Sequence, residues 1–368
     1  MDKLIRYYNI HNLVNILVYD VNVELVSELD FKYEYFSCEK ENASLLEINS
    51  HKIKIFPYDS LSIKGGSCIS HKTVYSVGKF AVEKDKEIGI YIIGNEYHIY
   101  TNGLNIIDII VQLVLIKNNH SFMHAACYKK NNKGYAITGL GGIGKTQIIM
   151  KSLQEPNVSI LGDDLVIVSK EGVIKSFPKP FMLKRQHKEV AGSRLRFFEF
   201  RRKTLSVYSG VFYFMKDNIP FSGLIKKLLF ADNALLRFIK LRLLPKDAEL
   251  VAMSPVNINI NIEDISKHNN IILVDRIDAS SSTIELNINK NEAVNRLVGI
   301  INAEFHTTIW VLLFLSKFNL VNLEYFNNNS YEVYRGFLEK NKFSHIESGI
   351  LIDPTSYCEM IVNKLEID

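Results

Sequence analysis

The chain has 368 residues, of which 47% are hydrophobic and 23% charged, a balance that predicts a packed soluble protein rather than a disordered one. Its N-terminus lacks the uninterrupted apolar core of a secretory signal, and its most apolar runs fall short of the roughly 18 uncharged residues that a bilayer span needs. The four cysteines have no paired spacing, which argues against a disulfide framework or a zinc site and favours a reduced, cytoplasmic environment.

Two domains are the default for this length, and we predict a β-rich domain over residues 1–103 and a second domain over residues 104–368. Short β-like runs separated by polar or glycine-containing turns follow one another up to Tyr100 and predict a mostly antiparallel sheet. These runs are NILVYDVNVEL (15–25), KYEYFSCE (32–39), HKIKIF (51–56) and IGIYIIGNEYHIY (88–100). Gly103 then precedes LNIIDIIVQLVLI, whose length and apolar density favour a buried helix.

A predicted hairpin follows, in which the strands SFMHAACYK and GYAITG are joined by a turn at Asn131 to Gly134. The second strand leads directly into a glycine-rich loop. After the loop, KTQIIMKSLQ indicates a short helix and VSILGDDLVIVS a strand that contains two acidic residues, before a tight turn at Glu171 and Gly172. The order strand, loop, helix and strand is the one that a phosphate site requires.

A basic helical insertion is predicted over residues 185–250. Between Arg185 and Lys246 there are 14 Lys/Arg and 4 Asp/Glu, a local charge of +10 in a chain whose net charge is +4. This segment is interpreted either as a solvated helical face or as a surface for an anionic acceptor or a membrane, and no nucleic acid is expected. Strand-like IILVDRI at Ile271 to Ile277 then resumes the core, and helices are predicted at 291–305, 307–318 and 355–365, with the asparagine-rich patches at 257–261 and 327–329 as loops.

The glycine-rich loop fits the G-x-x-x-x-G-K-[ST] pattern in full. Glycines let successive backbone N–H groups point at phosphate oxygens, and the following helix adds its positive N-terminal end. Lys145 would reach the β- and γ-phosphates, and the Thr146 hydroxyl would bind magnesium. The predicted nucleotide-binding residues are Gly139, Gly141, Gly142, Ile143, Gly144, Lys145 and Thr146.

The acidic residues Asp163 and Asp164 lie at the turn of an apolar run downstream of this loop. Two adjacent carboxylates are costly to bury unless a cation or hydrogen bonds compensate them, so the pair suggests a metal site and a proton acceptor. His124 lies on the strand before the loop and, taken alone, is interpreted as a structural histidine rather than a functional one. Cys127 on the same run is interpreted as a core residue.

Together, MHAACYKK, GYAITGLGGIGKT and LGDDLVIV resemble the nucleotide core of HPr kinase/phosphorylase and its relatives in the phosphoenolpyruvate carboxykinase superfamily. The resemblance covers about residues 122–169. It implies a histidine at His124 that assists catalysis, a phosphate-binding lysine at Lys145, and a magnesium hydroxyl at Thr146. It also implies that one acid of the pair is the base and the other the metal ligand; we assign Asp163 as base and Asp164 as ligand. Thr146 and Gln147 stand where HPr kinases usually have serine and glutamate. This departure argues against HPr itself as the substrate.

The resemblance therefore implies a kinase that transfers the γ-phosphoryl group of ATP, with Mg²⁺, to a hydroxyl of a peptide, protein or small molecule. Two alternatives stay open at this point. One is a nucleotide hydrolase or nucleotide-gated switch, in which Asp163 orients water, and the other is a non-catalytic nucleotide sensor. The sequence names neither the acceptor nor an oligomeric state.

Overall fold

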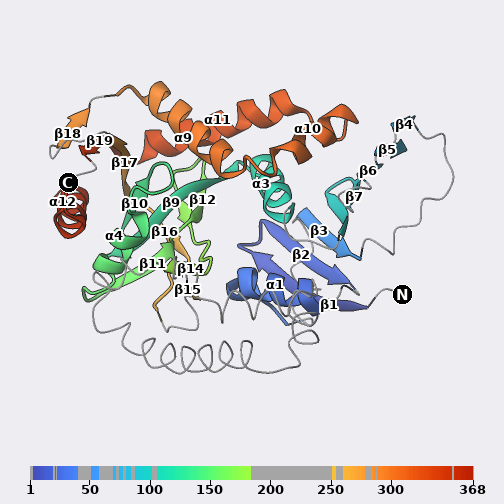
Figure 1. The fold of residues 1–368 in the computed structure, drawn as a ribbon, viewed down its shortest axis with the longest axis horizontal. Coiled ribbons are helices and arrows are strands. Elements are labelled where there is room, and N and C mark those ends of the chain that lie inside the picture. The colour runs from blue at the N-terminus through green and yellow to red at the C-terminus, as the bar shows by residue number, and fades with distance from the viewer. Residues whose placement is uncertain are drawn as a thin grey trace, which may run out of the picture.

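The computed structural model describes residues 3–19, 21, 23–39, 51–57, 69–71, 74–77, 80–83, 88–101, 106–183, 251–253, 260–277, 283–286, 288–349 and 352–367. The described residues form a mixed α/β fold with two large mixed sheets, one two-stranded sheet and seven α-helices (Figure 1). The predicted mixed α/β class is therefore confirmed. The predicted basic insertion, residues 185–250, lies outside the described residues.

The first sheet lies at one end of the molecule and has the strand order β1-β2-β3-β8-β7-β6-β5-β4. It is antiparallel except where β3 pairs in parallel with β2 and β8. Its strands are β1 (Leu4–Ile10), β2 (Val14–Tyr19), β3 (His51–Phe56), β4 (Ile69–His71), β5 (Val74–Val77), β6 (Phe80–Glu83), β7 (Ile88–Ile93) and β8 (Glu96–Thr101). The β-like run predicted over residues 88–100 is present and forms the hairpin of β7 and β8.

Helix α1 (Val23–Tyr33) and a 3₁₀ turn (Glu34–Phe36) stand where one strand run and the end of another were predicted. The prediction of strand for residues 32–39, and for the end of the run at 15–25, is therefore wrong. Leu25, Val26, Leu29 and Tyr33 are buried on one side of α1 at helical spacing, and packing of that stripe decides the conformation where β-branched and aromatic composition favours a strand.

The second sheet has the order β16-β13-β12-β9-β10-β17-β19-β18, with β11 paired to β9. β10 and β9 form the predicted hairpin, with Asn131 and Asn132 at positive φ in the turn. β17 pairs in parallel with β10 and β19. The strands are β9 (His120–Lys130), β10 (Lys133–Thr138), β11 (Val158–Gly162), β12 (Leu165–Ser169), β13 (Ile174–Lys175), β16 (Ile265–Ser266), β17 (Asn269–Ile277), β18 (Thr283–Leu286) and β19 (Lys342–Gly349), while β14 (Phe181–Leu183) pairs β15 (Val251–Met253) separately.

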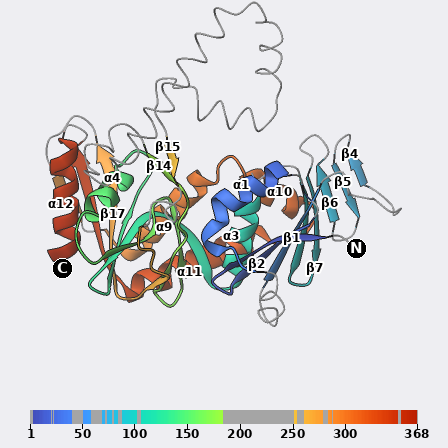
Figure 2. The same ribbon diagram turned by 90° about the horizontal axis from the view of Figure 1, so that it is seen from below.

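Helices cover both faces of the second sheet. α4 and α12 pack together in one hydrophobic cluster, and α3, α9 and α11 belong to the other, larger cluster. Both views place α12 at the end of the molecule opposite the first sheet (Figures 1 and 2). The bounds are α3 (Ile107–Lys117), α4 (Lys145–Ser152), α9 (Lys290–Glu304), α10 (Ile309–Lys317), α11 (Leu323–Lys340) and α12 (Pro354–Ile367).

The larger hydrophobic cluster runs from the first sheet into the second. It joins Ile16 and Ile53 of the first sheet to Val166 and Phe337 of the second unit, with helix α3 between them. A continuous core of this kind couples the two sheets mechanically. The predicted domain division at residue 103 stays a prediction.

Helix α11 spans residues 327–329, for which a loop was predicted from their asparagine content. That prediction is wrong. Phe326, Val333, Tyr334 and Phe337 are buried at helical spacing, and their packing outweighs the low helix propensity of the three asparagines. The predicted helices at 291–305, 307–318 and 355–365 are confirmed as α9, α10 and α12.

Within the described part of the chain, no single helix is both long and apolar enough to cross a membrane. α9 and α10 meet the length and composition criteria only when taken together, with a bend of 92° between them.

Candidate active site

The glycine-rich loop links the end of β10 to the start of α4, as the sequence predicts. Gly139, Gly142 and Gly144 have φ of +152°, +86° and +92°, a region that other residues rarely adopt. Gly144 is the N-cap of α4, and no side chain caps the helix there. No side chain therefore caps the first N–H groups of α4, which are the groups that a phosphate-binding loop would use.

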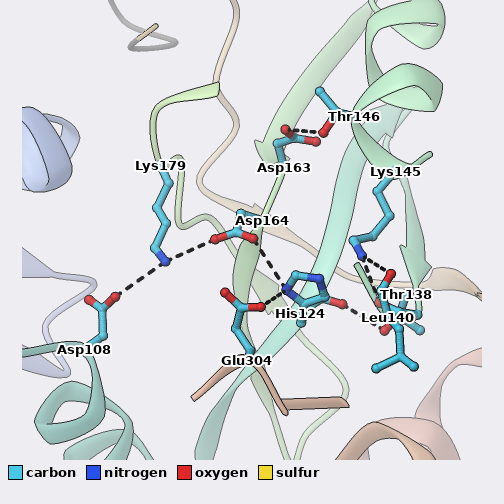
Figure 3. Close-up of polar contacts among 11 residues, drawn as sticks. Asp108, His124, Thr138, Leu140, Lys145, Thr146, Asp163, Asp164, Lys179 and Glu304 are labelled. Atoms are coloured by element: carbon cyan, nitrogen blue, oxygen red, sulfur yellow. Dashed lines mark hydrogen bonds and ion pairs between the residues drawn. The ribbon is translucent and has the colours of Figure 1, made fainter. Parts of the chain in front are cut away.

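Lys145 is the first residue of α4 and folds back over the loop. Its Nζ donates to the carbonyl oxygens of Gly139, at 2.8 Å, and Leu140, at 3.1 Å (Figure 3). Burial lowers the pKa of Lys145 to about 8, against the opposing charges of Asp164 and Asp163. A buried ammonium at the loop has much to gain from an anion, so the residues present fit a nucleotide phosphate.

Gly139→Ala should destabilise the protein by about 2 kcal/mol or more, because its positive φ is strained for alanine. The added Cβ would also lie 2.3 Å from the carbonyl oxygen of Val274. Gly141→Ala is the matched control, since a Cβ there meets nothing within 4 Å, and it should change stability by less than about 0.5 kcal/mol. Chemical denaturation measures both; equal losses in the two variants would contradict this account of the loop.

The acidic pair lies at a break in a long strand pairing. β11 ends at Gly162 and β12 begins at Leu165, and both pair antiparallel with β9. Asp163 and Asp164 lie between them. At this bend Asp163 points to α4 and Asp164 points to the side of α9 (Figure 3). The two carboxylates therefore have different surroundings.

Asp163 is buried against the helix that follows the loop. Its Oδ2 accepts a hydrogen bond from Thr146 Oγ1 at 2.9 Å, and its Oδ1 is buried without a hydrogen-bond partner among the described residues. Burial raises the pKa of Asp163 to about 7, despite the hydrogen bond from Thr146. A divalent cation beside Asp163 would balance the negative charge of its buried carboxylate. The Thr146 hydroxyl and the Asp163 carboxylate therefore fit Mg²⁺. The structure thus brings Thr146 together with Asp163 rather than with Asp164, the ligand assigned from the sequence.

Asp164 is the more accessible of the two acids, with a side chain 40% exposed. Its Oδ2 accepts from Lys179 Nζ at 3.2 Å, while its Oδ1 lies 3.5 Å from His124 Nδ1. Burial opposes ionisation of Asp164, but the charge of Lys179 outweighs it and holds the pKa of Asp164 below the usual value. Asp164 is therefore a carboxylate at neutral pH.

His124 lies on β9, opposite Leu165, and is buried. Its Nδ1 is 3.2 Å from Glu304 Oε2 as well as 3.5 Å from Asp164, without hydrogen-bond geometry to either (Figure 3). Burial lowers the pKa of His124 to about 4, and the Lys145 charge acts in the same direction. A neutral imidazole with one nitrogen directed at two carboxylates can accept a proton or a metal ion.

Two groups of described residues have spacing suited to a metal ion. In the first, the ligand atoms of His124, Asp164 and Glu304 all lie within 4.8 Å of one another. The second joins Asp275 of β17 to His345 and Glu347 of the neighbouring strand β19.

Arg296 distinguishes the second group from the first. It forms an ion pair with Asp275, and its Nη1 lies 3.3 Å from His345 Nε2. A guanidinium already balances that carboxylate, so a metal ion is not needed there.

All the residues predicted to act in catalysis or metal binding lie close together beside the glycine-rich loop. They are His124, Lys145, Thr146, Asp163 and Asp164. Ile143 and Cys127 are buried in the core. Sequence reasoning missed Glu304 at the end of α9, Lys179, and Asp108 behind it. Only Lys179 carries a local signal, since a lysine between two prolines shortly after the acidic pair has a restrained backbone.

No protein-family model matches the chain, and a comparison with curated proteins finds no match.

Proposed function

We propose that the protein is a Mg²⁺-dependent ATP phosphotransferase that phosphorylates a hydroxyl group of a peptide, protein or small molecule. The observation that carries this proposal is the convergence of a phosphate loop, the Thr146–Asp163 contact and an accessible carboxylate beside a neutral histidine. The resemblance to the HPr kinase/phosphorylase core supports the same reaction. A hydroxyl acceptor needs a nearby proton acceptor, which Asp164 supplies.

The loop glycines and Lys145 would bind the phosphates, with the Lys145 ammonium moving from the loop carbonyls to phosphate oxygens. Thr146 and Asp163 would hold Mg²⁺. When bound, that ion neutralises charge on the β- and γ-phosphates. Catalysis is then mainly positioning and charge stabilisation.

In the transfer step the acceptor oxygen bonds to the γ-phosphorus, the bond from that phosphorus to the β–γ bridging oxygen breaks, and ADP leaves. The acceptor proton goes to Asp164, beside which His124 is placed to assist. This exchanges the roles assigned to the two acids from the sequence. The reason is that Asp163 is occupied by Thr146 whereas Asp164 faces the more open side.

The rate of ATP consumption with and without an acceptor tests the proposal. A kinase should hydrolyse Mg-ATP slowly in water and form ADP much faster once a suitable hydroxyl compound or peptide is added, with the label of [γ-³²P]ATP appearing in that acceptor. Rapid turnover in water alone would favour a hydrolase or switch. Binding of ATP without turnover in any acceptor pool would favour a nucleotide sensor. An anionic acceptor, predicted from the basic insertion, stays a prediction because residues 185–250 are not described.

A further inference from the structure

A line of four alternating charges runs from helix α1 to the candidate active site. Lys32 Nζ on α1 lies 2.6 Å from Asp108 Oδ2 on α3. Lys179 Nζ lies 3.5 Å from the same oxygen of Asp108 and 3.2 Å from Oδ2 of Asp164. Figure 3 shows Lys179 between the two carboxylates. The line therefore connects a helix of the first 103 residues to the acid pair.

Asp108 is the fixed centre of this line. Tyr33 on α1 donates to its Oδ1 at 2.6 Å, so the carboxylate is held by groups from α1 as well as by Lys179. Its side chain is only 13% exposed. Burial opposes ionisation of Asp108, but Lys32 and Lys179 outweigh it and hold its pKa well below the usual value.

Lys179 is held in place from both directions. Its side chain is 16% exposed, and Pro178 and Pro180 restrict the backbone on either side. Burial disfavours the charged ammonium, but Asp108 and then Asp164 outweigh it and raise its pKa. Buried charges of this kind are unfavourable unless each has a partner of opposite charge, so loss of one member disturbs its neighbours.

The contact of Lys179 with Asp164 also orients that carboxylate. Because Lys179 takes Oδ2, the other oxygen, Oδ1, is the one that lies toward His124. Removing Lys179 leaves Asp108 with Lys32 and Tyr33, whereas Asp164 loses the only lysine within ion-pair distance in the described chain. The change would therefore act mainly on Asp164.

We infer that Lys179 is a positioning residue for Asp164, and that Asp108 and Lys32 in turn position Lys179, so that helix α1 belongs to the catalytic unit. The functional part of this inference rests on the proposed function, in which Asp164 receives the acceptor proton. The electrostatic part does not, because it concerns contacts within the folded chain.

Steady-state hydrolysis of Mg-ATP, with water as the probe acceptor, tests the functional part. Lys179→Met should lower kcat by about 10-fold to 100-fold, the scale expected for a misplaced catalytic group, and change the KM for ATP by less than about twofold. Lys179→Arg keeps the charge and should recover most of the rate. Asp108 contacts Lys179 directly, and Lys32 contacts it only through Asp108. The loss of kcat should therefore be smaller in Asp108→Asn than in Lys179→Met, and smaller again in Lys32→Met.

The same rates in an Asp164→Asn background show whether Lys179 acts through Asp164. Lys179→Met should then cause no further loss, since the group that it positions is already gone. Lys129→Met is the matched control. It also breaks a lysine ion pair, in which Lys129 Nζ lies 2.6 Å from Glu263 Oε1, but this pair does not include either acid of the pair Asp163 and Asp164, so kcat should be unchanged. A multiplicative loss in the double variant, or an equal loss in Lys129→Met, would overturn the inference.

A double-mutant cycle on the unfolding free energy separates failure of this inference from failure of the proposed function. Lys179→Met and Asp164→Asn each remove one half of the same ion pair, so the double variant should be less destabilised than the sum of the two. A wild-type protein that neither binds nor turns over Mg-ATP would contradict the proposed function, and the cycle would still decide the coupling. Additive destabilisation would contradict the coupling between Lys179 and Asp164. Because the cycle measures unfolding rather than activity, it can also be carried out if Lys179→Met is too unstable for kinetics.

Discussion

Replacing Lys145 by methionine is expected to weaken binding of Mg-ATP by about 100-fold, because charge-assisted hydrogen bonds to the phosphates contribute up to roughly 3 kcal/mol. Methionine keeps an unbranched apolar side chain that lacks only the terminal ammonium group. It also removes an ammonium whose burial lowers its own pKa, so the folded state should be retained. Isothermal titration with Mg-ATP gives the affinity, and thermal unfolding checks the fold.

Lys151→Met is the control for this experiment. Lys151 lies on the same helix, α4, but its Nζ is 3.3 Å from Glu359 and its side chain is 33% exposed. A surface ion pair of this kind contributes roughly 0 to 1 kcal/mol, so ATP affinity should match the unmodified protein. If Lys145→Met bound Mg-ATP as tightly as Lys151→Met, the loop would not be the phosphate site.

The two acids should fail in different ways when each is replaced by asparagine. Asp164→Asn should lower kcat by about 100-fold to 10,000-fold, the range for loss of a general base, while sparing Mg-ATP affinity. Asp163→Asn should instead raise the Mg²⁺ concentration needed for half-maximal activity by about 10-fold or more, because it removes the carboxylate paired with Thr146. Rates measured across a Mg²⁺ titration distinguish the two effects.

The opposite pattern has a definite meaning. If Asp163→Asn abolished transfer at saturating Mg²⁺ and Asp164→Asn shifted only the metal dependence, the assignment made from the sequence would be restored. Loss of neither function in either variant would remove the acid pair from the mechanism altogether. Asparagine preserves volume, so both comparisons are made on proteins of similar packing.

Local chemistry explains why the loop and its neighbours could be predicted. The positive φ of Gly139, Gly142 and Gly144, and of Asn131 and Asn132 in the preceding turn, are conformations that these residue types adopt readily. The flanking strand β10 and helix α4 follow from short-range patterns. The mixed α/β class, the hairpin and the conformation of the glycine-rich loop were therefore accessible from the order of residues alone.

Composition misled the prediction where burial decides the conformation. The helix α1 has a β-like sequence and the helix α11 contains three consecutive asparagines, yet each buries an apolar stripe against the larger hydrophobic cluster. The free energy gained from burying such a stripe exceeds the small differences in intrinsic propensity.

The sequence by itself determined the loop, the lysine, the threonine and the presence of an acid pair, because these depend on residues close together in the chain. Only the tertiary structure decided that Asp163 meets Thr146 while Asp164 meets Lys179, since this depends on which face of a broken strand each carboxylate takes. Glu304 and Asp108 reach the site from α9 and α3, 140 and 56 residues away from Asp164 in the sequence. No local pattern marks such residues, because folding of the whole core brings them into contact.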